Sequence, residues 1–328
     1  MREEAVIGGA QASCLTYVAP GQVELRPAPL RLGGVDDLVV LQAQHSGISR
    51  GTERLVFNGK VPPSEHERMR GPFQHGDFPF PVGYGYSWVG HIVGDGAQSY
   101  FGLFPHQDHV EVPREALTAL PEGLDPRRAV LTANMETALN IAWDSGAGPG
   151  DRISVVGGGV LGLLVAGVVS DIAGTDVEIV DIDGARETVA GALGAGFATP
   201  DRAAADRDVV IHTSASEAGL ATALSLAGTE ATVVEASWFG AATPSVPLGG
   251  AFHSRRLVLK SSQVGMVSPS RRVRWTYQRR LKMAMRLLLD DKYDRLITGD
   301  VAFVDLPYRI GDILDPKADG LATAVSYL

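Results

Sequence analysis

Cysteine is almost absent from this chain of 328 residues, in which Cys14 is the only thiol. A single thiol excludes a disulfide within the chain and any zinc site built from several cysteines. Apolar runs of about 20 residues, the length that a membrane helix needs, are also missing, and the first thirty residues lack a signal-peptide pattern. We therefore expect a cytoplasmic protein that does not cross a membrane.

Positive charge is scarce as well. Lys and Arg number 29 against 38 Asp and Glu, so the formal net charge is −9. A general affinity for nucleic acid or for an anionic membrane is therefore not expected. The chain is 45% hydrophobic and 20% charged, which is ordinary for a globular protein long enough to form two domains.

The most informative stretch is 151–162, which reads DRISVVGGGVLG. Its mostly apolar, β-branched run at 153–156 predicts a buried parallel strand. Gly157, Gly159 and Gly162 follow with G-x-G-x-x-G spacing, and the apolar segment 160–172 is long enough for a helix. In this pattern the first glycine permits a tight turn, the second lets backbone approach a pyrophosphate, and the third lets the helix pack on the strand. The N–H groups at the helix start then face the phosphates.

An acidic residue after the next strand selects the cofactor. A second apolar run at 177–180 ends in Asp181, and the whole strand–glycine–helix–strand–acid pattern predicts a dinucleotide site. The Asp181 carboxylate can accept hydrogen bonds from both ribose hydroxyls of NAD. It would repel the extra phosphate of NADP by about 4 kcal/mol at a separation of about 4 Å, although Arg186 can soften this repulsion. The predicted cofactor is NAD(H) in preference to NADP(H).

The chain around this stretch divides into three parts. Residues 1–122 contain short β-like runs broken by Gly and Pro, which predicts a mostly antiparallel β domain. Residues 123–265 alternate between helix-like and strand-like segments and predict a doubly wound parallel sheet. Residues 266–328 hold a helical segment at 274–290 and two short strand-like runs. Because they are too few for a domain, we expect them to pack back onto the first part.

This order resembles the medium-chain dehydrogenase/reductase superfamily over nearly the whole chain. Local similarities are SGISRGTE at 46–53, GYSWVG at 85–90, VPREALTALPEGL at 112–124 and ETALNIAW at 136–143. Two of these motifs, SGIS-x-GTE and G-Y-x-x-V-G, also resemble the bacteriochlorophyllide dehydrogenases, a zinc-free branch. The resemblance implies a discontinuous GroES-like catalytic domain (1–122 and 266–328), a Rossmann NAD-binding domain (123–265), a small-molecule substrate and a homodimer.

The resemblance also locates the residues where relatives hold zinc. Zinc alcohol dehydrogenases of this superfamily use a cysteine, a histidine and a third ligand, and alignment places Ser49, Tyr86 and Ala133 there. The glutamate after the ligand histidine becomes Ser87. These side chains lack the thiolate, imidazole or carboxylate that zinc requires, and the cysteine cluster of the structural zinc lobe is missing too. The resemblance therefore implies catalysis without zinc.

A site without metal must polarise its carbonyl with hydrogen-bond donors. The catalytic candidates are Tyr86 as proton donor, Thr52 as hydroxyl relay, Ser49, and Glu136 as base or substrate-hydroxyl acceptor. Structural alternatives remain open for three of them. Tyr86 can instead form an aromatic pocket wall, Thr52 can cap a loop or helix, and Glu136 can be an acid at a helix start.

Other polar groups receive structural interpretations. Glu53 is expected to pair with Arg50 or Arg54. The eight histidines show no metal-binding pattern, and His106 and His109 are expected in a loop. The segment SSQVG at 261–265 either lines the cleft near the nicotinamide or links the domains. Five arginines are expected to form a solvated face, with an anionic substrate or a subunit contact as alternatives: Arg271, Arg272, Arg274, Arg279 and Arg280.

Taken together, the residues predict a zinc-independent, NAD(H)-dependent oxidoreductase that interconverts an alcohol and a carbonyl by hydride transfer. One alternative is an NAD(P)H-dependent reductase of activated C=C bonds of the quinone or enoyl reductase type. A second is a dinucleotide-binding protein without catalysis. The residues predicted to bind the cofactor are Gly157, Gly159, Val160, Leu161, Gly162, Asp181, Ile182, Arg186, Ser214 and Thr137, the last matching a family threonine that lies against the nicotinamide.

Overall fold

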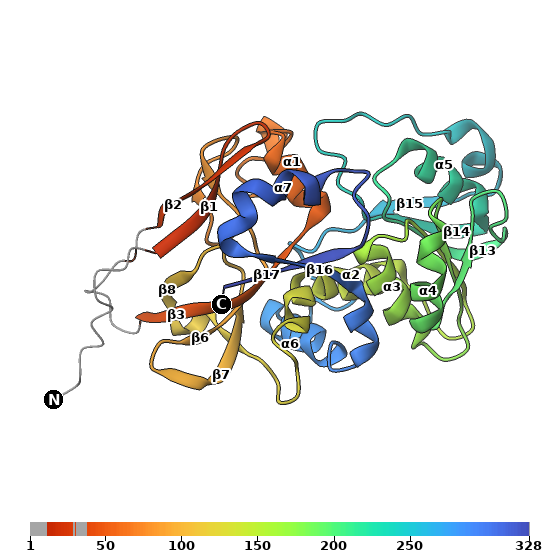
Figure 1. The fold of residues 1–328 in the computed structure, drawn as a ribbon. Coiled ribbons are helices and arrows are strands. Elements are labelled where there is room, and N and C mark those ends of the chain that lie inside the picture. Colours follow the sequence, from red (N-terminus) through yellow and green to blue (C-terminus); the bar gives the residue numbers. More distant parts are fainter. Residues whose placement is uncertain (1–11, 29, 31–37, 328) are drawn as a thin grey trace. The chain divides into compact units, whose positions relative to one another are not determined.

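Two compact units make up the computed structural model, which describes residues 12–28, 30 and 38–327 (Figure 1). Unit 1 combines the chain up to Ala133 with the segment from Ile297 on, and unit 2 is Asn134–Leu296. The sequence predicts divisions at 122/123 and 265/266. In the structure, residues 266–296 belong to unit 2 instead of packing onto the first part of the chain. The reason is packing within unit 2: the Arg280 guanidinium binds Asn140, and the ring of Tyr293 lies against Gly167.

Unit 2 is built on a six-stranded parallel sheet in the order β12-β11-β10-β13-β14-β15. The strands are β10 (Arg152–Val156), β11 (Asp176–Val180), β12 (Gly196–Ala198), β13 (Arg207–His212), β14 (Ala227–Glu235) and β15 (Val258–Ser261). The first of these strands in the chain, β10, lies inside the sheet, and the strand order reverses between β10 and β13. This is the Rossmann arrangement. The predicted doubly wound parallel sheet is confirmed.

Helices cover both faces of this sheet. Figure 1 shows α3 and α4 on one side of the parallel strands and α5 on the other. Inward residues such as Ile153, Val155 and Val210 are fully buried, as expected for strands covered on both faces. The helices are α3 (Val160–Ser170), α4 (Glu187–Ala192), α5 (Glu217–Leu226) and α6 (Tyr277–Leu287), with α2 (Thr132–Ser145) beginning at the division between the units.

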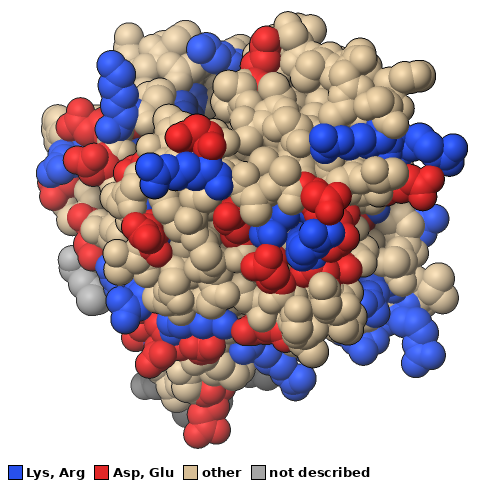
Figure 2. Space-filling view, turned by 90° about the vertical axis from the view of Figure 1, so that its right-hand side faces the viewer, with Lys and Arg blue, Asp and Glu red and all other residues tan. Residues whose placement is uncertain are grey.

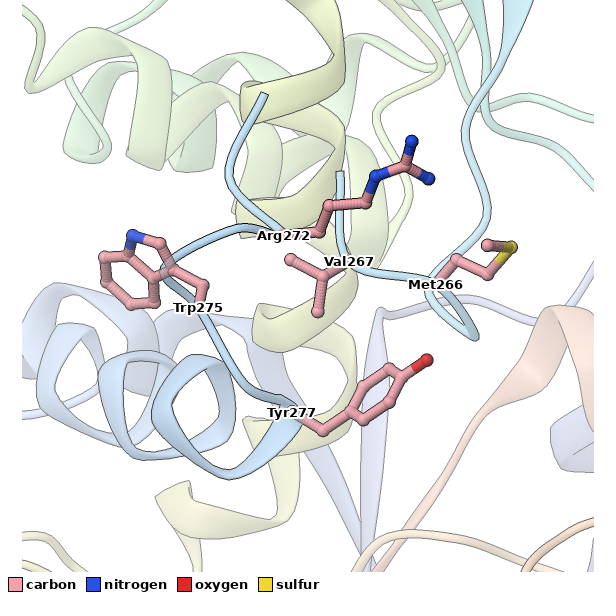
Figure 3. A pocket seen from close by; sticks show the side chains of 5 residues that line it. All are labelled: Met266, Val267, Arg272, Trp275 and Tyr277. Atoms are coloured by element: carbon pink, nitrogen blue, oxygen red, sulfur yellow. The ribbon is translucent and has the colours of Figure 1, made fainter. Parts of the chain in front are cut away.

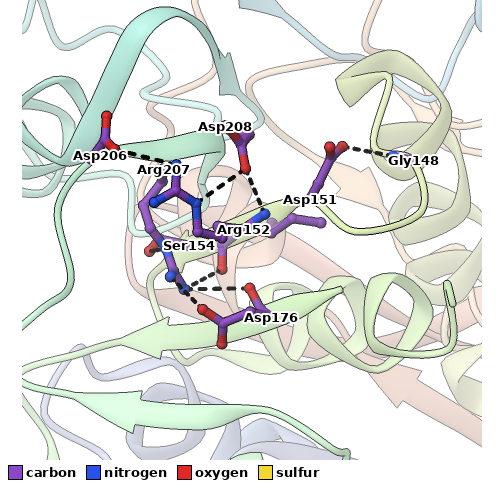
Figure 4. Close-up of polar contacts among 9 residues, drawn as sticks. Gly148, Asp151, Arg152, Ser154, Asp176, Asp206, Arg207 and Asp208 are labelled. Atoms are coloured by element: carbon purple, nitrogen blue, oxygen red, sulfur yellow. Dashed lines mark hydrogen bonds and ion pairs between the residues drawn. The ribbon is translucent and has the colours of Figure 1, made fainter. Parts of the chain in front are cut away.

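A buried arginine ties three strands together where they begin (Figure 4). Arg207, at the start of β13, donates from Nε to Ser154 Oγ (2.9 Å), from Nη1 to Asp176 Oδ2 (2.7 Å) and from Nη2 to the carbonyl of Ile153 (3.0 Å). Arg152 pairs with Asp206 and Asp208 beside it. The charged groups at this edge therefore stabilise the sheet, and the opposite, carboxyl edge is where a ligand is expected.

Unit 1 contains two sheets, ordered β2-β1-β5-β4 and β16-β17-β3-β6-β7-β9, with β8 paired to β3. Every pair in them is antiparallel except β16 with β17. The predicted mostly antiparallel β domain is confirmed, and β17 returns from the end of the chain to pair with β3. Trp88 and Phe104 pack edge to face in its core.

The strands of unit 1 are β1 (Ala12–Ala19), β2 (Gln22–Ala28), β3 (Leu38–Ile48), β4 (His75–Gly76), β5 (Val82–Gly83), β6 (Trp88–Ile92), β7 (Asp95–Gly102), β8 (His109–Pro113), β9 (Thr118–Ala119), β16 (Ile297–Ala302) and β17 (Ala322–Ser326). Its helices are α1 (Arg50–Phe57) and α7 (Leu306–Leu314). Short 3-10 or π-helical segments among the described residues are η1 (Pro63–Glu65), η2 (Arg114–Ala116), η3 (Arg128–Leu131), η4 (Gly184–Arg186), η5 (Leu248–Phe252), η6 (Asp291–Leu296) and η7 (Phe303–Asp305).

The segment 58–81 is mostly irregular but is anchored. Val61 and Phe78 are buried, and the Phe78 ring contacts His66 and Tyr84. On the face that Figure 2 shows, basic and acidic side chains are interspersed over most of the surface. Within the described part of the chain, no helix is long and apolar enough to cross a membrane.

Candidate functional site

The glycine turn joins β10 to α3 in unit 2. Gly157 has φ +114°, a left-handed conformation that favours glycine, and its N–H donates to the carbonyl of Val180 (2.9 Å). A Cβ on Gly162 would collide with the carbonyl oxygen of Gly157, whereas a Cβ on Gly159 would meet nothing within 4 Å. The first and third glycines thus serve the local packing, and the second keeps backbone open to a ligand.

The start of α3 offers donors beside this open backbone. Gly159 is the N-cap and has no side chain to cap the helix. The N–H groups of the first helical turn, at Val160, Leu161 and Gly162, lack partners within a helix and carry the positive end of its dipole. These three amides can therefore hold an anionic group such as a pyrophosphate.

Asp181 follows β11 and closes onto the glycine turn. Its Oδ2 accepts from the N–H of Gly158 (2.5 Å), and its Oδ1 accepts from the N–H of Asp183 (2.8 Å). The stem of Arg186 also lies over Gly158, and its guanidinium pairs with Asp183 (3.0 Å). The structure therefore brings Asp181 and Arg186 to the same turn as the predicted glycines. Ile182 lies beside them, 87% exposed.

A cluster of polar side chains lies at the carboxyl ends of β13 and β14. Of its members, the sequence analysis predicts only Ser214. His212 and Glu235 end these two strands and are direct neighbours in the sheet. The buried His212 ring binds Glu235 Oε2 through Nδ1 (2.6 Å) and Ser214 Oγ through Nε2 (2.7 Å). Ser214 Oγ is also hydrogen-bonded to Ser216, the N-cap of α5 (2.8 Å). This chain of contacts fixes the Ser214 hydroxyl at the edge where the glycine turn lies.

Glu136 is the fifth residue of α2 and lies beyond its first turn, so it is not an acid at a helix start, and a buried cation lies beside it. Arg280 Nε donates to Glu136 Oε1 (2.9 Å) and Arg280 Nη1 donates to Asn140 Oδ1 (2.7 Å). Burial raises the pKa of Glu136, and the neighbouring Arg280 lowers it. The catalytic role of Glu136 stays a prediction. The placement of Arg280 on a solvated face was wrong, because its side chain is 2% exposed and turns inward to this carboxylate. Thr137 follows Glu136 on α2.

Three predicted catalytic side chains meet in unit 1. The Tyr86 hydroxyl donates to Ser49 Oγ (2.5 Å), and Thr52 forms a second hydrogen bond with the phenol. Ser49 is the N-cap residue of α1, and Thr52 lies in its first turn. Burial raises the pKa of Tyr86 to about 12, against the lowering effect of these hydroxyls. Tyr86 therefore carries its proton throughout the neutral range, as a proton donor must.

Glu53 was expected to pair with Arg50 or Arg54, and this expectation was wrong. Its carboxylate is fully buried and accepts from the Tyr17 hydroxyl (2.9 Å) and from the N–H of Ser49 (2.7 Å). The two arginines lie on another side of α1 and donate to backbone carbonyls of the segment 314–320. The helix turns Glu53 inward and its arginine neighbours outward.

His106 completes a buried hydrogen-bond network that no sequence motif indicated. Its Nε2 contacts Glu53 Oε2 (3.0 Å) and its Nδ1 contacts Ser46 Oγ (2.6 Å). Ser46 Oγ in turn contacts the hydroxyl of Tyr327 (2.9 Å). His106 lies in a loop, as predicted, whereas the same prediction for His109 was wrong, because this residue begins β8. Because Glu53 also holds the N–H of Ser49, this network positions the residue to which Tyr86 donates.

The side chains that the resemblance aligns with zinc ligands do not form a donor set that fits zinc. Ser49 and Tyr86 offer hydroxyls that bind each other, and Ala133 offers a methyl group. Zinc sites in proteins use thiolate, imidazole or carboxylate. Among the residues that the structure describes, no group of three or more His, Cys, Asp or Glu is arranged to hold a metal ion.

Solved structures with the same fold include L-idonate 5-dehydrogenase from Escherichia coli K-12, with a TM-score of 0.78 at 13% identity over 97% of this chain and 99% of that one. A zinc-binding-type dehydrogenase from Sinorhizobium meliloti 1021, bound to NADP, has a TM-score of 0.73 at 18% identity over 97% and 99%. The alcohol dehydrogenase rspB from E. coli CFT073, complexed with NADH, has a TM-score of 0.74 at 15% identity over 97% and 100%.

The chain has the fold of these dehydrogenases. The fold class expected from the resemblance to medium-chain dehydrogenases, a Rossmann unit with a GroES-like one, is thereby confirmed. No family model matches the chain.

Alanine substitutions at two glycines separate packing from ligand binding in the turn. Gly162→Ala is expected to cost about 1 to 3 kcal/mol of unfolding free energy, because its Cβ meets the backbone of Gly157. Gly159→Ala is expected to leave stability within about 0.5 kcal/mol but to weaken NADH binding at least tenfold, since its methyl group occupies the open backbone. Denaturant unfolding and calorimetric NADH titration measure both. Equal NADH affinity in Gly159→Ala and the parent protein would contradict the assignment of this turn.

Proposed function

We propose that this protein is an NAD(H)-dependent oxidoreductase that interconverts an alcohol and a carbonyl without zinc. The observation that carries the proposal is the Tyr86 phenol, which donates to Ser49 where zinc dehydrogenases have ligands. Further support comes from the glycine turn with Asp181, and from the alcohol and polyol dehydrogenases that share the fold.

In this proposal, residues of unit 2 bind the dinucleotide. The dinucleotide supplies or accepts the hydride when it is bound. The amides at the start of α3 bind the pyrophosphate, and Asp181 accepts hydrogen bonds from the ribose hydroxyls. Ser214, held by His212, adds a hydroxyl near the same edge of the sheet. The charge on Asp181 favours NAD(H) over NADP(H).

The residues of unit 1 handle the proton. During carbonyl reduction, Tyr86 donates its phenolic proton to the substrate oxygen, and the hydroxyls of Ser49 and Thr52 stabilise the phenolate and return a proton to it. The reverse steps serve alcohol oxidation. No step uses a metal ion.

Asp181→Ala tests the choice of cofactor. We expect the ratio of kcat/KM for NADPH to kcat/KM for NADH to rise at least tenfold, because removing the carboxylate removes its repulsion of the extra phosphate. Steady-state kinetics with both cofactors measure this ratio, and Glu187→Ala, an exposed acid in α4, is the control. An unchanged ratio in Asp181→Ala would refute the role of this carboxylate.

The type of bond reduced is tested with a panel of ketones and matched enones. Loss of nicotinamide absorbance from NADH with ketones supports the proposed function. Loss with enones alone, giving saturated ketones, would replace it by C=C reduction. NADH binding by calorimetry with no turnover on either panel would contradict an enzymatic role and favour a dinucleotide-binding protein.

A further inference from the structure

Basic residues are concentrated in one segment of unit 2. Between positions 236 and 289 the chain has ten Lys and Arg and no Asp or Glu, although the net charge of the whole chain is −9. Such a segment is unusual in an acidic protein, and it produces a local positive field that attracts anions. Part of it is α6, with the loop 262–276 that leads into this helix.

Most of these cations face solvent without an acidic partner. Arg271, Arg272, Arg274 and Arg279 are exposed, and over the described residues none of the four has an ion pair. Two of them lie over aromatic rings instead, with Arg279 4.0 Å from the ring centroid of Trp275. Their positive charge therefore remains available to an anion.

One of these arginines, Arg272, lines a pocket in unit 2 (Figure 3). Val267 lies at its centre, and Met266, Trp275, Tyr277 and Arg272 surround it. Its volume is about 170 Å³. A cavity of about 150 Å³ can hold benzene, so this one accommodates a single ring with a small substituent. Met266 and Tyr277 are 64% and 57% exposed, which leaves apolar surface uncovered at its rim.

Hydrogen bonds and ring contacts hold part of the pocket wall in place. The buried Arg280 guanidinium donates to the carbonyls of Val264 (2.6 Å) and Met266 (3.3 Å), and the Tyr277 hydroxyl donates to the carbonyl of Gly265 (3.0 Å). The Trp275 ring contacts both the Arg279 guanidinium and the ring of Trp143, with ring centroids of the two indoles 4.7 Å apart. Such preorganisation lowers the entropic cost of binding.

We propose that this pocket binds an organic anion that has a planar apolar group. The ring of such a ligand contacts Tyr277, Met266 and the edge of Trp275, and its phosphate or carboxylate pairs with Arg272. Arg271 and Arg274 raise the local anion concentration. Guanidinium groups suit this task because they bind phosphate and carboxylate in a bidentate way. The inference rests on unit 2 alone and does not depend on the proposed reaction.

The test uses phenyl phosphate as the probe, with phenol and inorganic phosphate as its two halves. Isothermal titration of the full chain is expected to show phenyl phosphate binding at least tenfold more tightly than either half. Arg272→Gln is expected to weaken phenyl phosphate binding at least tenfold. Arg286→Gln, an exposed arginine in the last turn of α6 that does not line the pocket, is expected to change it less than twofold.

Three results would overturn the proposal. If phenyl phosphate does not bind the folded parent protein at millimolar concentration, the pocket is not a binding site for it. If Arg272→Gln and Arg286→Gln weaken phenyl phosphate binding equally, the protein attracts anions only through its general positive charge. If phenyl phosphate and inorganic phosphate bind with equal affinity, the ring is not recognised. Because Arg272 is exposed, its variant is expected to fold, and circular dichroism checks this. Trp275→Leu supplies an independent variant that keeps every charge and is expected to weaken phenyl phosphate more than inorganic phosphate.

Discussion

Tyr86→Phe is expected to lower kcat for carbonyl reduction at least tenfold while NADH affinity changes less than twofold. The substitution keeps the ring and removes only the hydroxyl that donates to Ser49. General acid catalysis by a positioned side chain contributes roughly a hundredfold or more, so loss of the donor should dominate over any change in pocket shape. Initial rates with NADH and a reducible ketone, together with calorimetric NADH titration, measure the two effects.

Tyr84→Phe is the matched control for this prediction. Tyr84 is buried, and its ring packs edge to face on Tyr86 with centroids 5.9 Å apart. Removing its hydroxyl disturbs the same aromatic group without touching the Tyr86–Ser49 contact, and we expect kcat within threefold of the parent. Equal loss in both variants would make Tyr86 a pocket wall and not a proton donor.

The pH dependence of the reduction rate is a second test of the role of Tyr86. Only the protonated phenol can donate, and burial raises the pKa of Tyr86 to about 12. The contribution of Tyr86 to reduction is therefore complete at neutral pH and is lost only as the pH rises through about 12. A loss of reduction rate at neutral pH that disappears in Tyr86→Phe would contradict this assignment.

Arg280→Met is expected to lower the free energy of unfolding of unit 2 by about 3 to 5 kcal/mol. Arg280 is 2% exposed and binds the Glu136 carboxylate, whose side chain is 9% exposed. Removing one partner leaves an uncompensated buried charge, and this costs more than the pair contributes. The same guanidinium also holds the carbonyls of Val264 and Met266. Denaturant unfolding followed by far-UV circular dichroism measures the change.

The double variant Glu136→Met with Arg280→Met separates the buried charge from the lost backbone contacts. With both charges replaced by apolar groups, we expect at least about 1.5 kcal/mol of the loss to be regained. No recovery would show that the carbonyl contacts of Arg280, and not its pairing with Glu136, stabilise the unit. Glu136→Gln then tests catalysis, since a purely structural carboxylate leaves the pH profile of kcat unchanged.

Local patterns in the sequence predict the cofactor half of the site well. The glycine turn, the helix after it and Asp181 lie within 31 consecutive residues of a βαβ unit (151–181), and short-range sterics determine their arrangement. The network around Glu53 could not be found in this way. His106 lies 53 positions from Glu53, and Tyr327 lies 281 positions from Ser46, so only the folded β sheets bring these residues together.

Arginine placement shows a second limit of sequence patterns. Arg279 and Arg280 are adjacent and look equivalent in the motif, yet one is exposed and the other is 2% exposed. Helical periodicity separates their directions by about 100° but does not say which direction is inward. That depends on Glu136 and Asn140, which belong to a helix about 140 residues earlier in the chain. The same contacts explain why residues 266–296 join unit 2.

Deuteride transfer by metal-free protein tests the central claim most directly. The protein is treated with a chelator until zinc is absent by elemental analysis and is then incubated with NADH deuterated at C4 and a panel of ketones. We expect an alcohol with one deuterium on its carbinol carbon, formed at the rate shown by untreated protein. Loss of this transfer on chelation, with recovery when zinc is added, would contradict catalysis without zinc.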